Sequence, residues 1–149
     1  MTFKEKVYNA YKLLLEEKLS NVQLVLKELH ESASNETKST AGDKHETALA
    51  MLQIEQENKR KQLSELQLQQ SILNKIDPAI VSPVVLNGSL VHTDRGYFFI
   101  SIALGKLIIN GETVFALSPS SPLGQKLLRC SVPGSLELNG ILYVILDVA

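Results

Sequence analysis

Two carboxylates three positions apart, Asp43 and Glu46, are the residues whose types and spacing best suit chemistry in this chain of 149 residues. They lie in a small polar stretch, NETKSTAGDKHET over residues 35–47, between two long helical patterns. Carboxylate oxygens are ligands that hard cations such as Mg²⁺ prefer. An exposed pair supplies too few ligands for a metal site of its own.

The same two acids also suit a purely structural role. Asp43 followed three positions later by Glu46 has the form of a capping box, in which the aspartate accepts backbone N–H bonds at a helix start. Both carboxylates would also interact favourably with the positive end of the helix dipole. His45 beside Glu46 is expected to be a solvated neighbour rather than a general base, and Glu36 a solvated loop charge. The residues alone leave the cap and the metal role open.

Two long amphipathic helices are expected to position these acids. Apolar residues recur with the three-and-four spacing of one helix face, first at Phe3, Val7, Tyr11, Leu14, Val22, Val25 and Leu29, and later at Ala48, Leu52, Leu63, Leu66 and Leu73. Neither stretch contains an internal proline or glycine. We therefore expect two helices of roughly 30 residues, each about 45 Å long.

A comparison of the two stripes predicts how the helices pair. In an antiparallel hairpin, the residue numbers of two facing residues add to the same total along the whole pair of helices. One total is shared by four apolar pairs: Leu29 with Ala48, Val25 with Leu52, Leu14 with Leu63, and Tyr11 with Leu66. Lys18 and Lys59 share it too, so one polar step would explain a break in both stripes. This predicts an antiparallel coiled coil with an acidic tip near residues 36–46. The rival is a parallel homodimeric coiled coil built from either stripe.

A change in composition divides the chain. Most charged residues precede position 77, and the boundary lies in DPAIVSP, whose two prolines end a helix. The sequence predicts the coiled-coil hairpin over residues 1–76, a short semi-rigid linker over 77–83 and a second domain over 84–149.

The second domain has the pattern of a small antiparallel sheet with one short helix. Asn-Gly pairs at 87–88, 110–111 and 139–140 are strong two-residue hairpin signals beside β-rich runs at 83–86, 106–109, 113–117 and 141–148. Between the last two pairs, the segment 118–129 offers a serine cap, an early proline and a leucine face at Leu123, Leu127 and Leu128. The expected fold class is therefore α+β.

The second domain resembles the C-terminal signature of the bacterial Gre transcript-cleavage factors. The matching residues are the run Ser121-Pro122-Leu123-Gly124 before a leucine helix, Gly134 in a turn, and Tyr143-Val144-Ile145 in a closing strand. At the tip, Gly42-Asp43-Lys44-His45-Glu46 is similar to the family's Gly-Asp-x-x-Glu, which opens the second helix of its coiled coil. The resemblance covers nearly the whole chain and implies an FKBP-like sheet domain after the hairpin.

The resemblance also implies a function. Gre factors insert their coiled coil into the secondary channel of RNA polymerase, where tip carboxylates help to hold the second Mg²⁺ of the polymerase active centre. Asp43 and Glu46 are then expected to act there in trans, as catalytic groups and shared metal ligands that stimulate transcript cleavage in backtracked complexes. The chain would be an accessory factor rather than an enzyme, with no cofactor of its own. Ser121, Pro122, Leu123 and Gly124 would contact the partner.

Departures from the family pattern point to a divergent member. Thr-Ala-Leu-Ala follows Glu46 where the family usually has Asn-Ala-Glu-Tyr, and Lys38, Lys44 and His45 add positive charge that would weaken metal capture. Arg129-Cys130 stands where the family commonly has Gly-Lys, and Gly134-Ser135 where it has Gly-Asp. Polymerase binding without cleavage stimulation is one alternative. The other is a non-catalytic interaction module, with a coiled-coil arm and an FKBP-like domain, in which the acids only cap a helix.

Composition argues against several other classes. A net charge of −1 and 44% hydrophobic residues are typical of globular proteins, and the short Lys59-Arg60-Lys61 run beside glutamates does not indicate sequence-specific nucleic-acid binding. The charged N-terminal turns lack the long apolar run of a membrane span or secretory signal. A single cysteine, Cys130, permits no internal disulfide. We therefore expect a cytoplasmic monomer whose aromatic residues 97–99 pack in the core rather than line a peptide pocket.

Overall fold

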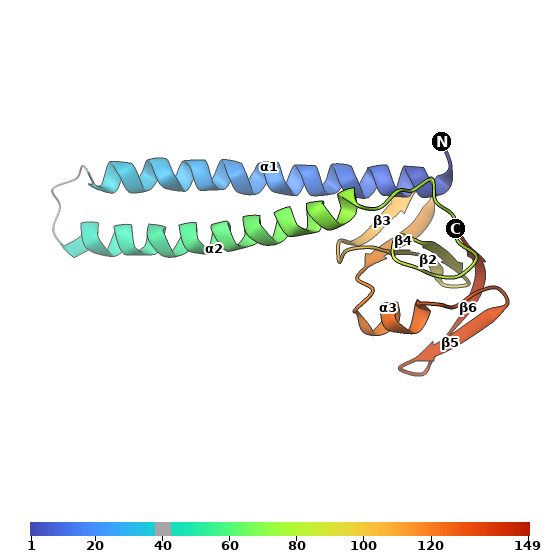
Figure 1. The fold of residues 1–149 in the computed structure, drawn as a ribbon. Coiled ribbons are helices and arrows are strands. Elements are labelled where there is room, and N and C mark those ends of the chain that lie inside the picture. The colour runs from blue at the N-terminus through green and yellow to red at the C-terminus, as the bar shows by residue number, and fades with distance from the viewer. Residues whose placement is uncertain (38–42) are drawn as a thin grey trace. The chain divides into compact units, whose positions relative to one another are not determined.

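The computed structural model describes residues 1–37 and 43–149, with side chains described outside 37–45. Its elements are α1 (Phe3–Thr37), α2 (Asp43–Asn74), β1 (Leu90–Thr93), β2 (Gly96–Ile100), β3 (Gly105–Ile109), β4 (Glu112–Leu117), α3 (Pro122–Leu127), β5 (Gly134–Leu138) and β6 (Ile141–Val148) (Figure 1). The predicted α+β class, with two long helices before a sheet that carries one short helix, is confirmed. Within the described ranges, no helix is long and apolar enough to cross a membrane.

The chain separates into two compact units. One unit, here called the helical arm, is Leu14–Gln69, and the other, called the sheet unit, combines Met1–Leu13 with Gln70–Ala149. The first turns of α1 and the last turns of α2 therefore pack with the sheet. The division into a hairpin over 1–76, a linker over 77–83 and a domain over 84–149 stays a prediction.

The buried seam of the helical arm differs in detail from the predicted stripe. Leu15 and Leu19 are buried on α1, whereas the predicted Leu14 is only half-buried. Lys18 is exposed, so the expected polar break in the α1 stripe is wrong, because Leu19 continues the buried face one residue later. On α2 the buried polar residue of the seam is Gln56, at 7% exposure.

The sheet has the strand order β3-β4-β2-β1-β6-β5. All neighbours are antiparallel except β2 and β4, which run parallel from Tyr97 opposite Val114 to Ile100 opposite Leu117. The sheet is therefore mixed, and the expectation of a purely antiparallel sheet is wrong in this one pairing. The reason is the place of β3 at the edge of the sheet. The chain runs from β2 to this edge and returns through the β3–β4 hairpin, so β4 lies beside β2 and runs in the same direction.

Two of the three predicted Asn-Gly hairpins are confirmed. Asn110-Gly111 joins β3 to β4, and Asn139-Gly140 joins β5 to β6. Their φ values of 52° and 78°, and of 53° and 78°, are positive at both central residues, as a type I′ turn requires.

The third Asn-Gly pair is not a hairpin. Gly88 alone in the pair has positive φ, at 90°, and its N–H donates to the Ile100 carbonyl at 2.6 Å. The expected strand over 83–86 is likewise absent from the assigned strands and leaves one isolated bridge between Val84 and Ser131. The pair therefore forms a turn held against the end of β2.

Both faces of the sheet are covered within the sheet unit. Alternate residues of β2 point to opposite faces, so Phe98 joins a core with Leu127 of α3, whereas Phe99 contacts the Tyr11 ring of α1 at a centroid distance of 6.0 Å. The expectation of core packing is confirmed for Phe98 and Phe99, which are buried, whereas Tyr97 is only half-buried and stacks on His92 with ring centroids 4.1 Å apart. Leu123 and Leu128 pack against the core as the predicted leucine face requires.

Tyr11 ties the start of α1 to the sheet. Its hydroxyl lies 2.7 Å from the Gly105 carbonyl and 3.0 Å from the Val114 carbonyl, to either of which it can donate. Burial raises the pKa of Tyr11 to about 12, although backbone hydrogen bonds from Ala116 and Leu107 oppose the shift. The phenol therefore stays neutral and bonded across the physiological pH range.

Candidate functional site

The predicted acidic tip lies where the two long helices meet the segment 38–42. Helix α1 ends at Thr37 and α2 begins at Asp43, so the Gly-Asp-x-x-Glu motif opens the second helix of the arm (Figure 1). Lys38 and the side chains of Asp43, Lys44 and His45 lie outside the described residues. Both proposed roles of the Asp43 carboxylate, helix cap and metal ligand, therefore stay predictions.

Glu46 and Glu36 differ in their surroundings. Glu46 is exposed in the first turn of α2, where a carboxylate interacts favourably with the helix dipole. Glu36 is half-buried in the last turn of α1, so the expectation of a solvated loop charge is wrong. The helix continues through Glu36 because the preceding residues include neither glycine nor proline to end it.

The described residues of the arm form no metal site of their own. Among the described residues, no group of three or more histidine, cysteine, aspartate or glutamate side chains gathers as a metal site would require. A groove of about 310 Å³ close to the tip is lined by His30 and Arg60 together with neutral side chains. Asp43 and Glu46 can therefore bind Mg²⁺ tightly only where other groups complete its six oxygen ligands.

The Ser-Pro-Leu-Gly run forms the start of α3. Ser121 is the N-cap, with its Oγ accepting from the Gly124 N–H at 3.1 Å and donating to the Ser118 carbonyl at 2.6 Å. Pro122 occupies the first helical position and is exposed, whereas Leu123 is half-buried against the core. Gly124 is buried, and a Cβ there would collide with the Ser118 carbonyl. Each residue thus has a local structural role, and partner contact by this run stays a prediction.

The residue after the leucine helix keeps a backbone conformation that favours glycine. Arg129 has φ of 68°, and its N–H donates to the Val85 carbonyl at 2.8 Å. Its neighbour Cys130 is half-buried, with Sγ 3.2 Å from the Lys126 carbonyl. This turn therefore accommodates an arginine, at the cost of a strained backbone.

One polar residue that the sequence analysis missed is Lys4. It is only 5% exposed, and its Nζ donates to the Ile80 carbonyl at 2.6 Å. The sequence held a signal for this burial, because Lys4 precedes Val7 by three residues and Tyr11 by seven, on the same face of α1.

Comparisons with known proteins find a likeness of fold among solved structures. No family model matches the chain, and no curated protein matches it. Among solved structures, that of the transcription factor Gfh1, a factor of the Gre family, is similar over 92% of this chain and 92% of its own. The sequence identity is 17% and the TM-score is 0.37.

Proposed function

We propose that this protein is a Gre-like regulator of RNA polymerase, an accessory factor whose helical arm enters the secondary channel of the polymerase. One observation carries the proposal. A helical hairpin whose second helix opens with Gly42-Asp43-x-x-Glu46 precedes a sheet that carries the Ser121-Pro122-Leu123-Gly124 helix start. The resemblance to Gre factors rests on these two motifs and on this order of hairpin and sheet.

The lengths of the two helices support a reaching role. Helix α1 has 35 residues and α2 has 32, which correspond to about 50 Å each at about 1.5 Å rise per residue. The Leu14–Gln69 part contains several exposed large apolar residues, such as Leu24, Met51, Ile54 and Leu68. An arm of this length that ends in acids has a clear use if its target lies deep within a partner.

The proposed chemistry belongs to the polymerase, with the tip acids as contributors. Asp43 and Glu46 would donate carboxylate oxygens to the second Mg²⁺ of the polymerase, which activates a water and stabilises the leaving oxygen of a phosphodiester. Glu46 is exposed in the first turn of α2 and is available for such a contact. Asp43 would have to exchange any capping bond for the metal, because the same oxygens serve both roles.

The proposal is tested with cognate RNA polymerase stalled in a backtracked complex that holds 3′-labelled RNA. Wild-type protein with Mg²⁺ is compared with Asp43→Asn and Glu46→Gln, and with Glu57→Gln as a matched control, since Glu57 is an exposed α2 acid three turns from Glu46. Asparagine caps a helix about as well as aspartate, so Asp43→Asn keeps the helix start and removes the charge. We expect release of short 3′ fragments by wild type and by Glu57→Gln, and a loss of about 10²-fold or more in Asp43→Asn.

Three results distinguish the alternatives. Unchanged cleavage in Asp43→Asn would end the metal-ligand role of that carboxylate. Binding that requires the arm, without any cleavage, would identify a regulator that occupies the channel. Absence of binding to the polymerase would overturn the whole proposal and favour the interaction module.

A further inference from the structure

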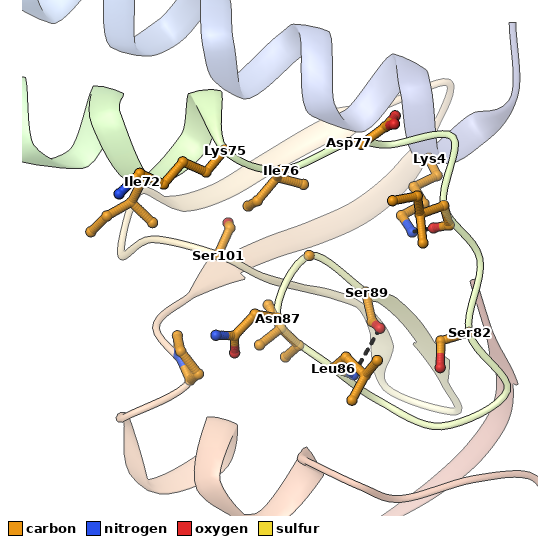
Figure 2. A pocket seen from close by; sticks show the side chains of 14 residues that line it. Lys4, Ile72, Lys75, Ile76, Asp77, Ser82, Leu86, Asn87, Ser89 and Ser101 are labelled. Atoms are coloured by element: carbon orange, nitrogen blue, oxygen red, sulfur yellow. Dashed lines mark hydrogen bonds between the residues drawn. The ribbon is translucent and has the colours of Figure 1, made fainter.

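The sheet unit contains a cavity that the proposed function does not use. It has a volume of about 350 Å³ and lies among the start of α1, the end of α2, the segment that follows α2 and the end of β2 (Figure 2). All of its lining residues belong to the sheet unit. A cavity of this size accommodates a small organic molecule.

One side of the cavity carries a buried cation. Lys4 is 5% exposed, and its ammonium uses one of three donors on the Ile80 carbonyl at 2.6 Å. Burial lowers the pKa of Lys4, and the nearby charge of Asp77 opposes that shift. Asp77 itself accepts the Ala79 N–H at 2.9 Å. Lys75 and Asp77 also line the cavity but are exposed, whereas Lys4 is buried, so an anionic group of an occupant would pair with the Lys4 ammonium.

Another side carries a buried hydroxyl. Ser101 is 5% exposed, and its Oγ has no hydrogen-bond partner among the described residues. Figure 2 shows this hydroxyl pointing toward the end of α2, across the cavity from Lys4. A buried hydroxyl without a hydrogen-bond partner is unfavourable. A ligand atom that forms a hydrogen bond with this hydroxyl therefore gains more binding free energy than one that contacts an already paired group.

The lining also includes apolar side chains, beside the polar residues Ser82, Asn87 and Ser89. Ile76 lies between Lys75 and Asp77 on one side, and Ile100 and Leu86 contribute from the sheet and the turn before it (Figure 2). The cavity thus has the Lys4 ammonium at one end, apolar side chains along its length and the Ser101 hydroxyl at the other end. A complementary molecule has an anionic end, an apolar middle and a neutral hydrogen-bonding end.

We propose that this cavity is a binding site for a small elongated carboxylate with a hydrogen-bonding group at its far end. The carboxylate accepts from the Lys4 ammonium, the apolar middle packs beneath Ile76, and the far group bonds the Ser101 hydroxyl. Charge pairing with a buried ammonium supplies most of the selectivity, because a charge-assisted bond is about twice as strong as a neutral one.

The test uses three probes of equal chain length on the full chain: 6-hydroxyhexanoate, hexanoate and 1,6-hexanediol. Binding is followed by amide chemical shifts of residues 86–89 and 100–101 in NMR titrations. We expect saturable binding of 6-hydroxyhexanoate at about 1 mM, with hexanoate weaker and the diol weaker by about tenfold or more. Lys4→Met should abolish the preference for 6-hydroxyhexanoate over the diol, and Ser101→Ala the preference for it over hexanoate.

The matched control is Lys126→Met, which removes an exposed lysine from α3 and should leave all three affinities unchanged. Equal binding of carboxylate and diol by the wild-type protein would overturn the proposal, as would the absence of saturable binding by any probe. If Lys4→Met does not fold, this wild-type comparison decides alone. The polymerase plays no part in these titrations, so their outcome is separate from that of the cleavage test.

Discussion

Among the described residues, the sheet unit buries many more apolar side chains than the helical arm does. In the sheet unit, Phe99, Val91 and Leu127 are fully buried between the sheet and the helices on its two faces. Among the described residues of the arm, the buried apolar side chains are Leu15, Leu19, Val22 and Leu66, at 1–7% exposure along a single seam. A two-helix seam leaves most of each helix surface in water, whereas a sheet covered on both faces encloses its side chains. The sheet unit is therefore expected to be the more stable part.

The largest expected effect is the removal of an aromatic ring from the sheet unit. Phe99→Ala should lower the free energy of unfolding by about 3–5 kcal/mol, because Phe99 is fully buried and contacts the Tyr11 ring. Urea unfolding followed by near-UV and far-UV circular dichroism measures this change. A loss below about 1 kcal/mol would mean that the sheet unit is not packed as described.

A matched leucine pair tests the weaker seam of the arm. Leu19→Ala should cost about 2–3 kcal/mol, whereas Leu24→Ala, at a side chain 56% exposed, should cost less than about 0.5 kcal/mol. Amide hydrogen exchange should show faster exchange within 14–37 and 46–69 for Leu19→Ala and unchanged protection in the sheet strands. Equal acceleration in both units would contradict the division into two units.

The smallest effect concerns the Tyr11 hydroxyl and depends on pH. Tyr11→Phe should cost about 1–2 kcal/mol at pH 8, because it removes the bond to the Gly105 or Val114 carbonyl. The pKa of Tyr11 is about 12 in the folded protein and about 10 in an unfolded chain, so the folded state holds more protons in this window. The contribution of Tyr11 to the free energy of unfolding is therefore fully present below pH 10 and is lost as the pH rises toward 12.

Urea midpoints at pH 8 and pH 11 for wild type and Tyr11→Phe check the sign. The variant should lose less stability between the two pH values than wild type does. Some decline should remain in the variant, because burial and the charges of Glu112 and Asp147 also raise the pKa of Tyr97. An identical decline in both proteins would show that Tyr11 does not carry the effect.

Local signals in the sequence predicted the parts of the fold that depend on neighbouring residues. The hairpins at 110–111 and 139–140 form because an Asn-Gly pair adopts two positive φ angles wherever both flanking strands can pair. The same dipeptide at 87–88 does not, because Gly88 bonds the distant Ile100 carbonyl and no strand precedes it among the described elements. The strands β1, β2 and β5 were not among the predicted β-rich runs, although β1 pairs with β2, and β5 with β6, across short turns.

The candidate sites divide in the same way. The sequence by itself determined that two long helices flank the tip motif and that α2 opens with Asp43 and Glu46, because helix periodicity and helix starts are encoded within a few residues. Only the tertiary structure decided that β2 and β4 run parallel and that Lys4 and Ser101 line one cavity. These two residues are almost a hundred positions apart, and no local pattern records a contact that packing of distant segments creates.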